Sequence, residues 1–499
     1  MTVSDYFIDP KKLRRFAPLA PLCAFSDVGY MLHNATASKI RTEALHEAHK
    51  HHEVIRLGPN RLSFSSVGAI KDIYGTGTSC IKGDAPYRTA GGTPNILTVI
   101  DKTWHSTKRK RLSAAFSTKQ LLAWEAKVAD KVERLLAQFD VRATALASSS
   151  ARISFDANTV NFYAWSKLFT FEAIGDIALG HQFGFLEAGT DNILVASNNG
   201  NRQVVKAGEC LYAVNRCLEP IIWSASWHST LKHLTKVLPR YSGWWKHAMS
   251  WPRIVRHLVR ERIQKEKRGE KIDDIFASLL NGSDGKPLGL DEDEILAETS
   301  HLLDAGLATT AVALTQVMHC LAKQPTALKK LRAEVDGAVE DTSSGPMYSQ
   351  VRSLPYLRAC LDEAMRLRPA LTAGQQRETP PEGMTIAGEW VPGGVFVSVP
   401  AYVAHRDPVV FPEPEEFRPE RWLGESGKLS QRYSLTFSQG GRVCIGKNIT
   451  YIEQTMLVAA MVRRYNFVLP YEPWEVEWEE YFNLYPKSLP LRLSRRCYT

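Results

Sequence analysis

A single cysteine near the carboxyl end of the chain stands where a ligating or reactive thiolate would be stabilised. Cys444 lies in the stretch FSQGGRVCIGKNIT, from Phe437 to Thr450, directly before an apolar run with the pattern of a helix. The unpaired N–H groups and the dipole of a helix N-terminus favour a thiolate. A thiolate is a strong axial ligand for haem iron. A lone cysteine is more often a buried structural residue, so its neighbours decide between the two roles.

The residues around this cysteine fit the ligand role. Gly440 and the glycine after it permit a tight backbone turn, and Gly446 permits the close approach of a bulky neighbour. Arg442, two residues before the cysteine, is placed to pair with a haem propionate. Phe437 is placed to pack against the ring face and the sulfur. We therefore expect these four residues to bind the cofactor that Cys444 ligates.

The order F-x-x-G-x-R-x-C-x-G resembles the haem-binding signature of the cytochrome P-450 family. The resemblance implies a mainly α fold with a smaller β region and a long central helix over a buried haem b, iron protoporphyrin IX, with Cys444 as its axial thiolate. It implies a haem-thiolate monooxygenase that takes electrons from an NADPH-linked reductase, activates dioxygen and oxidises a small organic substrate. The stretches HRDP, PEEFRPERW and TPPEGMTIAGEWVPGGVFVSVP look most like microsomal-type members from fungi.

Two charged residues on one helix resemble the E-x-x-R pair of that family. Glu363 and Arg366 are spaced i, i+3 within PYLRACLDEAMRLR, so they share a helix face and can form a charge-assisted pair. The resemblance adds Arg421 of FRPERW to a buried network that holds the cysteine region. A surface salt bridge of little energetic value is the alternative. These three residues are expected to be structural.

The segment from Asp291 to Lys323 predicts a long helix through the core. Acidic residues occupy its first turns, where the helix dipole favours them, and its 33 residues would extend about 50 Å. Its centre matches the family's oxygen-binding groove at Ala305, Gly306 and Thr309. By that resemblance the two small residues leave space above the iron, and Thr309 hydrogen-bonds dioxygen and helps to deliver protons.

The sequence departs from the family immediately before this threonine. The usual acid is replaced by Ala308, which carries no proton. Asp304 is on the same helix but is rotated from Thr309 by about 140°, which makes it a poor substitute. We favour proton supply by ordered water or by a group of the substrate. Otherwise the reaction is a dehydrogenation, coupling or rearrangement. A non-catalytic haem-binding protein is the remaining alternative.

Further candidates for the propionates come from two other stretches. When DKTWHSTKRKRLSAAFS is aligned with the family's W-x-x-x-R helix, His105 takes the tryptophan position and Arg109 the arginine position. Arg377 in QQRETPPEG resembles another propionate-binding arginine. By resemblance the substrate pocket lies at 87–100, 303–310 and 370–376. The polar glutamines of the third window indicate a substrate with oxygens or nitrogens, such as a secondary metabolite.

The net charge of +9 is explained in part by basic residues gathered at one site in the sequence. They are Lys102, Lys108, Arg109, Lys110 and Arg111. In the family this helix borders the face that meets an acidic reductase, and complementary charge speeds such encounters. A solvated basic face is the alternative. Nucleic acid is not an expected partner, because no aromatic-interleaved basic patch or binding motif is present.

Hydrophobic patterning predicts the remaining elements. We expect a β-rich stretch at 52–80 with a hairpin around Gly-Pro-Asn, mostly helix from 102 to 330, and further helices at 326–340, 355–368 and 445–465. VPGGVFVSVP predicts a strand pair across a Gly-Gly turn. A basic, proline-rich segment at 1–25 precedes a single catalytic domain at 26–499.

The eight cysteines contain no C-x-x-C pair, which favours a reducing compartment. No run of 18 apolar residues predicts a transmembrane helix. We therefore expect the protein on the cytoplasmic side, either soluble or at the surface of the endoplasmic reticulum, with peripheral membrane contact as an option.

Overall fold

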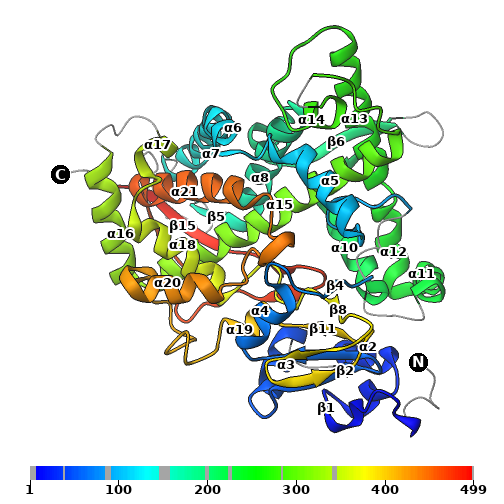
Figure 1. Cartoon of the computed structure of the whole chain (residues 1–499). Coiled ribbons are helices and arrows are strands. Elements are labelled where there is room, and N and C mark those ends of the chain that lie inside the picture. The colour runs from blue at the N-terminus through cyan, green and yellow to red at the C-terminus, as the bar shows by residue number, and fades with distance from the viewer. Residues whose placement is uncertain are drawn as a thin grey trace.

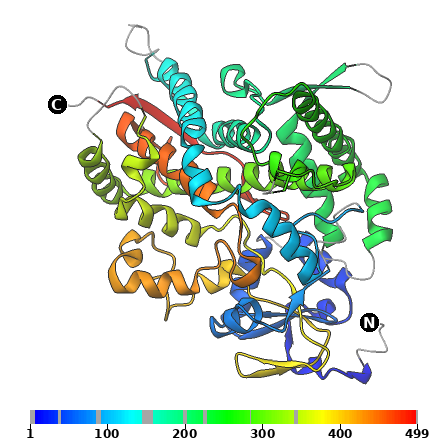
Figure 2. The same cartoon turned by 45° about the horizontal axis from the view of Figure 1, so that its top comes forward.

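The computed structural model describes residues 7–36, 40–84, 92–144, 158–196, 202–222, 228–282, 285–339 and 345–496. Within these ranges the chain forms a large helical part and five small sheets (Figure 1). The largest sheet and the N-terminal helices lie at one end of the molecule, and the helical part fills the other (Figures 1 and 2).

The largest sheet joins strands from the first hundred residues to strands between 377 and 398. Its strand order is β1-β2-β3-β11-β8-β4. The strands are β1 (Ala17–Pro18), β2 (Val54–Gly58), β3 (Arg61–Phe64), β4 (Ile81–Lys82), β8 (Arg377–Glu378) and β11 (Phe396–Ser398). β2 and β3 form the hairpin predicted around Gly-Pro-Asn, whereas β11 runs parallel to β3. The cofactor-binding candidate Arg377, on β8, is therefore anchored beside strands from the first hundred residues.

Two details of the β prediction were wrong. Within 52–80 the segment after β3 is helical, as α4 (Gly68–Tyr74), because its apolar residues are spaced as on a buried helix face. The strands on either side of Gly393-Gly394 do not pair with each other. β10 (Glu389–Val391) pairs with β9 (Met384–Ile386), while β11 pairs with β3 and β8. Partners distant in the sequence determined the pairing, which a local turn signal does not reveal.

Of the helices before the central one, α2 (Asp27–Thr36) and α3 (Arg41–His49) lie beside the large sheet at the lower end of Figure 1, as does α4, and most of the others lie above the central helix or to its right. The others are α5 (Lys102–Ser113), α6 (Thr118–Ala123), α7 (Glu125–Thr144), α8 (Phe162–Leu179), α9 (Phe185–Ala188), α10 (Ala207–Ile222), α11 (His228–Val237), α12 (Pro239–Ala248), α13 (Trp251–Lys267) and α14 (Ala277–Leu280). The mostly helical character predicted for this region is confirmed. The hairpin of β6 (Asn192–Ala196) and β7 (Arg202–Lys206) was not predicted.

The remaining elements follow the central helix. They are α16 (Pro325–Ala338), α17 (Tyr348–Val351), α18 (Pro355–Leu367), α19 (Ala401–Ala404), α20 (Gly424–Tyr433), α21 (Lys447–Arg464), β12 (Tyr465–Val468), β13 (Trp478–Glu480), β14 (Leu484–Pro486) and β15 (Pro490–Arg495). β15 pairs with β12 and with β5 (Thr159–Asn161). Short 3₁₀ turns occur at Leu13–Arg15, Pro21–Ala24, Pro419–Trp422 and Gly440–Arg442. The helices predicted at 326–340, 355–368 and 445–465 are confirmed.

The central helix is α15 (Glu292–Lys323), which confirms the predicted long core helix. The side chain of Asp291 caps it by accepting a hydrogen bond from the backbone N–H of Glu294, as expected for an aspartate at this position. Among the described helices it alone is long and apolar enough to cross a membrane by composition, and 78% of its most apolar window is buried inside the protein. It therefore serves as the core helix around which the others pack.

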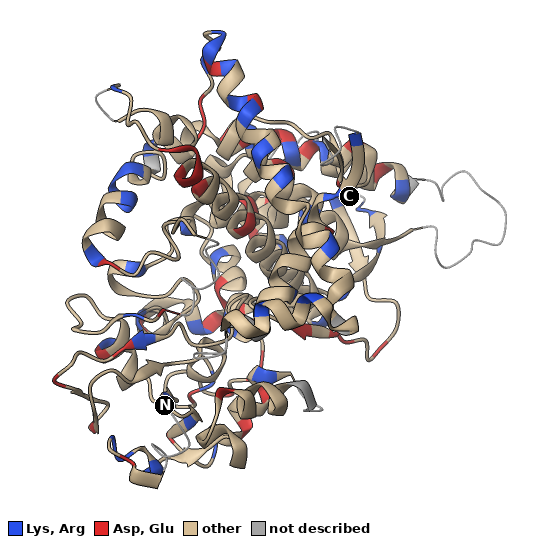
Figure 3. Cartoon of the chain, turned by 90° about the vertical axis from the view of Figure 1, so that its right-hand side faces the viewer, with Lys and Arg blue, Asp and Glu red and all other residues tan. Residues whose placement is uncertain are grey.

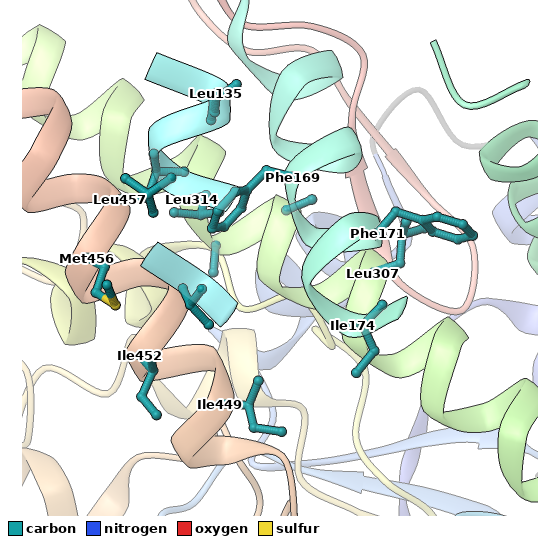
Figure 4. Close-up of a cluster of buried hydrophobic side chains, with 14 of the residues drawn as sticks. Leu135, Phe169, Phe171, Ile174, Leu307, Leu314, Ile449, Ile452, Met456 and Leu457 are labelled. Atoms are coloured by element: carbon teal, nitrogen blue, oxygen red, sulfur yellow. The ribbon is translucent and has the colours of Figure 1, made fainter. Parts of the chain in front are cut away.

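The tightest crossing in the core joins α15 to α8. A Cβ placed on Gly306 would lie 2.5 Å from Cγ1 of Ile174, so only glycine lets the two helices approach this closely. Figure 4 shows Phe169 and Ile174 of α8 beside Leu307 and Leu314 of α15, with side chains of α21 completing the cluster. Since α8 is apolar on all sides, it is buried on all sides. This packing fixes the height and rotation of α15 above the cysteine loop.

Candidate active site

The cysteine loop is held in a fixed shape by backbone contacts. The N–H of Cys444 donates to the carbonyl oxygen of Phe437 at 2.9 Å, which closes the loop. Gly440 has a φ of 66°, and a Cβ there would lie 2.1 Å from the carbonyl oxygen of Tyr74. Both its conformation and the lack of space require glycine. The loop therefore presents Cys444 in one orientation at the start of α21.

Cys444 differs from the other described cysteines in its surroundings. It is exposed, whereas the other six are buried. Desolvation of the sulfur, which lies inside the fold, raises the pKa of the Cys444 thiol, and this is opposed by N–H groups of Gly446 and Lys447 and by the charges of Arg109 and Lys447. The sulfur thus has open space on one side and hydrogen-bond donors on the other. A ligand cation in that space would complete the stabilisation of the thiolate.

Beside the loop lies a cavity of about 350 Å³ with a strongly basic lining. Its basic lining residues are Lys82, Lys102, His105, Arg109, Arg377 and Arg442, and no described lining residue is an aspartate or glutamate. The structure thus brings together all four predicted propionate-binding residues, which come from α5, β8 and the cysteine loop. Clustered cations without acids suit a ligand with more than one negative charge.

The arginines of this cavity are oriented by backbone oxygens. Arg442 donates from Nη1 to the carbonyl oxygen of Val99 at 2.6 Å and from Nη2 to that of Ile100 at 2.8 Å. Arg109 donates from Nη1 to the carbonyl oxygen of Val443 at 2.7 Å, which ties α5 to the cysteine loop. These bonds leave other N–H groups of both guanidinium groups available to a ligand.

The crowded positive charge shifts the pKa values of the cavity residues. Burial, followed by the charge of Arg377, lowers the pKa of Arg442 to about 10. Burial, followed by Arg442 and Arg109, lowers the pKa of His105 to about 4. His105 is therefore neutral near pH 7 and can only donate or accept a hydrogen bond. An anionic ligand would relieve the repulsion among the arginines.

The sequence analysis missed one residue of this cavity, Lys82. It is buried, at 5% exposure, and among the described residues no acidic side chain pairs with it. Burial lowers its pKa well below the usual value, and the charges of Arg377 and Arg442 lower it further. Lys82 and Arg377 are even cross-strand neighbours in the β4–β8 pair. A two-residue strand carries no local signal for burial, so only the tertiary pairing reveals this lysine.

The middle of α15 lies against the cysteine helix. Thr309 donates from Oγ1 to the carbonyl oxygen of Ala305 at 2.8 Å. The next residue, Thr310, shares a hydrogen bond of 3.1 Å with Thr450 of α21, six positions after the cysteine. Thr309 and Ala305 keep some accessible surface within an otherwise buried helix. The missing side chain of Gly306 instead faces Ile174 of α8, so the space expected there above the iron is used for helix packing.

The predicted E-x-x-R residues meet in a buried network. The carboxylate of Glu363 accepts from Nε and Nη2 of Arg366 at 2.8 and 2.9 Å and from Nε of Arg421 at 2.9 Å. It also accepts from Nε1 of Trp422 at 2.8 Å and from the backbone N–H of Arg418 at 2.9 Å. Glu363 and Arg366 have no exposed side-chain surface. Tryptophan and the backbone N–H were not part of the prediction.

A histidine links this network to the cysteine loop. Arg366 donates from Nη1 to the carbonyl oxygen of His405 at 2.8 Å. Nε2 of His405 accepts from the backbone N–H of Leu435 at 2.8 Å, at the start of the loop. Burial lowers the pKa of His405 to about 3, so this nitrogen stays an acceptor. The network therefore supports the loop through defined hydrogen bonds.

The basic cluster on α5 is not the open surface that the sequence predicted. Lys108 is buried and pairs with Glu294 at 2.7 Å and Glu298 at 2.8 Å, and Arg111 also pairs with Glu294 at 2.8 Å. The acidic first turns of α15 thus neutralise two of the five cluster residues. Basic positions are spread over several helices and are interspersed with acidic ones (Figure 3). Of the predicted five, only Lys102 and Lys110 are exposed.

Comparison with known proteins identifies the kind of molecule that carries this site. A family model described as cytochrome P-450 matches residues 28–487. The chain belongs to the cytochrome P-450 family. The cytochrome P-450 monooxygenase cicH of Emericella nidulans is 30% identical over 476 residues, covering 91% of this chain and 89% of the relative. Benzoate 4-monooxygenase of Aspergillus niger is 27% identical, with 97% and 93% covered.

A third relative acts on a different kind of molecule. Tryprostatin B 6-hydroxylase of Neosartorya fischeri is 25% identical over 460 residues, covering 91% of this chain and 77% of the relative.

The protein described here is a P-450 monooxygenase, an oxidoreductase that incorporates oxygen. Members of the P-450 family generally bind haem through a cysteine thiolate. An exposed cysteine beside a cavity of unneutralised cations fits such a group.

Proposed function

We propose that this P-450 binds haem b through the thiolate of Cys444 and hydroxylates a fungal secondary metabolite. The observation that carries the proposal is the pairing of the exposed Cys444 with the adjacent acid-free basic cavity. Arg442, Arg109, Arg377 and His105, with Lys82, hold the propionates. Phe437, Gly440 and Gly446 shape the loop against the ring. When bound, haem supplies the activation of dioxygen and the oxidation of the substrate.

The residues of α15 supply the proton path. Thr309 holds its hydroxyl proton toward the carbonyl oxygen of Ala305, so its lone pairs face the open side. A water that donates to these lone pairs can be held there and can itself deliver the proton. Ala308 contributes only space. Proton supply therefore depends on Thr309 with water or on a group of the substrate, and Ala305 keeps room for both.

The variant Ala308→Asp tests this arrangement. A carboxyl at position 308 adds the acid that the family usually places beside the threonine, so we expect the fraction of reductant converted to product to change at least about twofold. The measurement is the ratio of product formed to NADPH consumed, and Ala308→Asn serves as a control of the same size. If the ratio stays the same in both variants, the missing acid does not limit proton delivery.

The variant Lys82→Met tests the role of the buried lysine. Without haem, the variant should be about 1 to 3 kcal/mol more stable, because an uncompensated buried charge is replaced by an apolar side chain. With haem, it should release the cofactor several-fold faster. Urea unfolding of both forms and transfer of haem to apomyoglobin measure the two effects. Lys110→Met on the exposed side of α5 should change neither, and equal effects of the two variants would contradict the assignment.

The electron donor is proposed to be an NADPH-linked reductase that docks beside the cysteine loop. The amide of Gln439 in the loop donates to the carbonyl oxygen of Arg432 at the end of α20 at 2.7 Å. Arg432 on α20 is exposed and Lys447 is partly exposed, which offers positive charge beside the cysteine loop. Complementary charge of this kind increases the association rate more than the affinity.

We propose further that residues 26–499 act as one catalytic domain at the cytoplasmic surface of the endoplasmic reticulum or free in the cytoplasm. The sheet that joins β2 and β3 to β8 and β11 supports a single unit. Exposed apolar side chains support peripheral membrane contact. They are Leu234 and Val237 on α11, Leu238, Met249 and, near the N-terminus, Phe7, Ile8, Leu22 and Leu32.

The absorption spectrum of the reduced protein under carbon monoxide tests the haem-thiolate proposal. A strongly red-shifted Soret band is expected, and a band at the histidine-haem position would contradict it. Product analysis under ¹⁸O₂ then tests the reaction. One labelled oxygen in the product is expected for hydroxylation. An unlabelled, dehydrogenated or coupled product would establish the second candidate, which Ala308 alone favours.

A further inference from the structure

One face of α15 keeps accessible surface in the middle of the helix, and it carries a carboxylate that the proposed chemistry does not use. His301, Asp304, Ala305 and Thr309 all keep accessible surface although the helix crosses the core. With 100° of rotation per residue, these four positions fall within about 140° of one another. Asp304 and Thr309 lie at the two edges of this face. The two positions are separated by about 7.5 Å along the helix axis, so a substrate that spans this length can contact both Thr309 and Asp304.

Asp304 is held in one orientation by the facing helix α10. Its Oδ1 accepts from Nδ2 of Asn215 at 3.3 Å. The same amide nitrogen donates to the carbonyl oxygen of Leu211 at 3.4 Å, which fixes the amide so that its N–H groups face both acceptors. Asn215 is buried, at 3% exposure. The pair thus joins α10 to α15 through side chains.

The second oxygen of Asp304 has no protein partner among the described residues. No lysine, arginine or histidine forms an ion pair with this carboxylate in that part of the chain. The titratable group that faces it from β14 is the phenol of Tyr485, which is neutral because burial raises its pKa. Oδ2 keeps accessible surface, since it is not among the fully buried atoms that lack a partner. An enclosed carboxylate with one free oxygen is thus available to a ligand.

Such a carboxylate is costly unless a ligand compensates it. Burial raises the pKa of Asp304 to about 6, opposed by the hydrogen bond from Asn215. The group is therefore mostly ionised near pH 7.5 and carries a charge that the protein does not neutralise. A protonated amine placed at Oδ2 would recover that cost through a charge-assisted hydrogen bond. A carboxylate at the same place would be repelled.

We infer that Asp304, held by Asn215, is a specificity-determining residue that binds a basic nitrogen of the substrate and excludes anionic substrates from the space beside Thr309. The inference rests on the proposed haem-thiolate function for its place next to the reacting group. The expected substrate has a positive charge, whereas benzoate, after which one relative is named, is an anion. The substrate class is an amine whose oxidised carbon lies on the Thr309 side of its nitrogen.

A matched set of probes tests the inference without the natural substrate. The probes are N,N-dimethyl-4-phenylbutylamine, its carbon isostere (5-methylhexyl)benzene and the anion 5-phenylpentanoate. Binding to the haem-loaded ferric protein is followed by the spin-state shift of the Soret band and, independently, by equilibrium dialysis at pH 7.5. The unmodified protein should bind the amine at least about tenfold more tightly than the carbon isostere or the anion.

Two variants and a control complete the test. Asp304→Asn should reduce the preference for the amine to within about twofold of the isostere, while its binding of the isostere stays the same. Asp304→Glu should retain the preference. Asp293→Asn, which removes the same charge from the exposed first turn of α15, should bind all three probes like the unmodified protein.

The outcomes distinguish failure of this inference from failure of the proposed function. Equal or unmeasurable binding of the amine by the unmodified protein, or a preference that persists in Asp304→Asn, overturns the inference. The carbon monoxide spectrum of each sample reports the thiolate separately. Without the thiolate band the proposed function fails, whereas the dialysis result still decides whether Asp304 selects for amines.

Discussion

The variant Cys444→Ser should lose the red-shifted Soret band under carbon monoxide and all monooxygenase turnover. A serine hydroxyl stays protonated and is a poor ligand, so the strong electron donation of the thiolate disappears. The loop itself should survive, because its closure depends on the N–H of residue 444 and the carbonyl oxygen of Phe437 rather than on the sulfur. Haem content, the spectrum and product formation measure the loss.

A second cysteine serves as the matched control. Cys210 on α10 is buried, at 1% exposure, and burial raises its pKa to about 11, so it is inert. Cys210→Ala should cost about 1 kcal/mol of stability as a small core truncation and leave the spectrum unchanged. Cys444→His should give the band of a histidine-ligated haem. If Cys444→Ser kept both haem and the red-shifted band, another residue would be the ligand.

The variant Glu363→Gln should destabilise the protein by about 3 to 5 kcal/mol, because it leaves two buried arginines without their shared carboxylate. Five N–H groups converge on this carboxylate in the structure, and its pKa lies below the usual value because the hydrogen bond and charge of Arg366 outweigh burial. The amide of glutamine would also turn an N–H toward these donors. Urea unfolding of the haem-loaded protein measures the loss.

A surface acid gives the comparison for this effect. Glu425 pairs with Lys428 at 2.7 Å on α20, but both side chains are mostly exposed. Glu425→Gln should therefore change stability by less than about 1 kcal/mol. Because the network reaches Leu435 through His405, Glu363→Gln should also lower the fraction of protein that shows the thiolate band. A destabilisation no larger than that of Glu425→Gln would show that the network is dispensable.

The sequence predicts the helices of this protein well where local signals and burial agree. α15 has an acidic, capped start, an apolar middle and a proline after its end, and its predicted and observed bounds differ by one residue. The prediction that β10 pairs with β11 was wrong because local signals do not identify the true partners. Their partners β9, β3 and β8 lie elsewhere in the chain, and a turn signal such as Gly393-Gly394 says nothing about distant strands.

The site shows the same division between local and distant information. The cysteine loop and the E-x-x-R residues are compact motifs, so spacing alone indicated which residues to examine. Lys82 and the ion pairs of Lys108 depend on β4–β8 and α5–α15 contacts, and no spacing rule contains them. The resemblance implied that Gly306 leaves open space above the iron. In the structure, the space that a side chain of Gly306 would fill lies against Ile174. Only the direction of its Cβ, which is a tertiary property, distinguishes these two roles.

The β4–β8 pairing has a consequence for how the protein is made. Lys82 and Arg377 are opposite each other in this pair, and the remaining cavity residues lie at 74–80, 102–109 and 439–442. A ribosome that has synthesised the first three hundred residues has made ten of the fourteen described lining residues, but neither Arg377 nor any part of the cysteine loop. Cofactor capture must therefore wait until nearly the whole chain has emerged. Until then two like charges oppose the closing of the sheet, and haem entry removes that opposition.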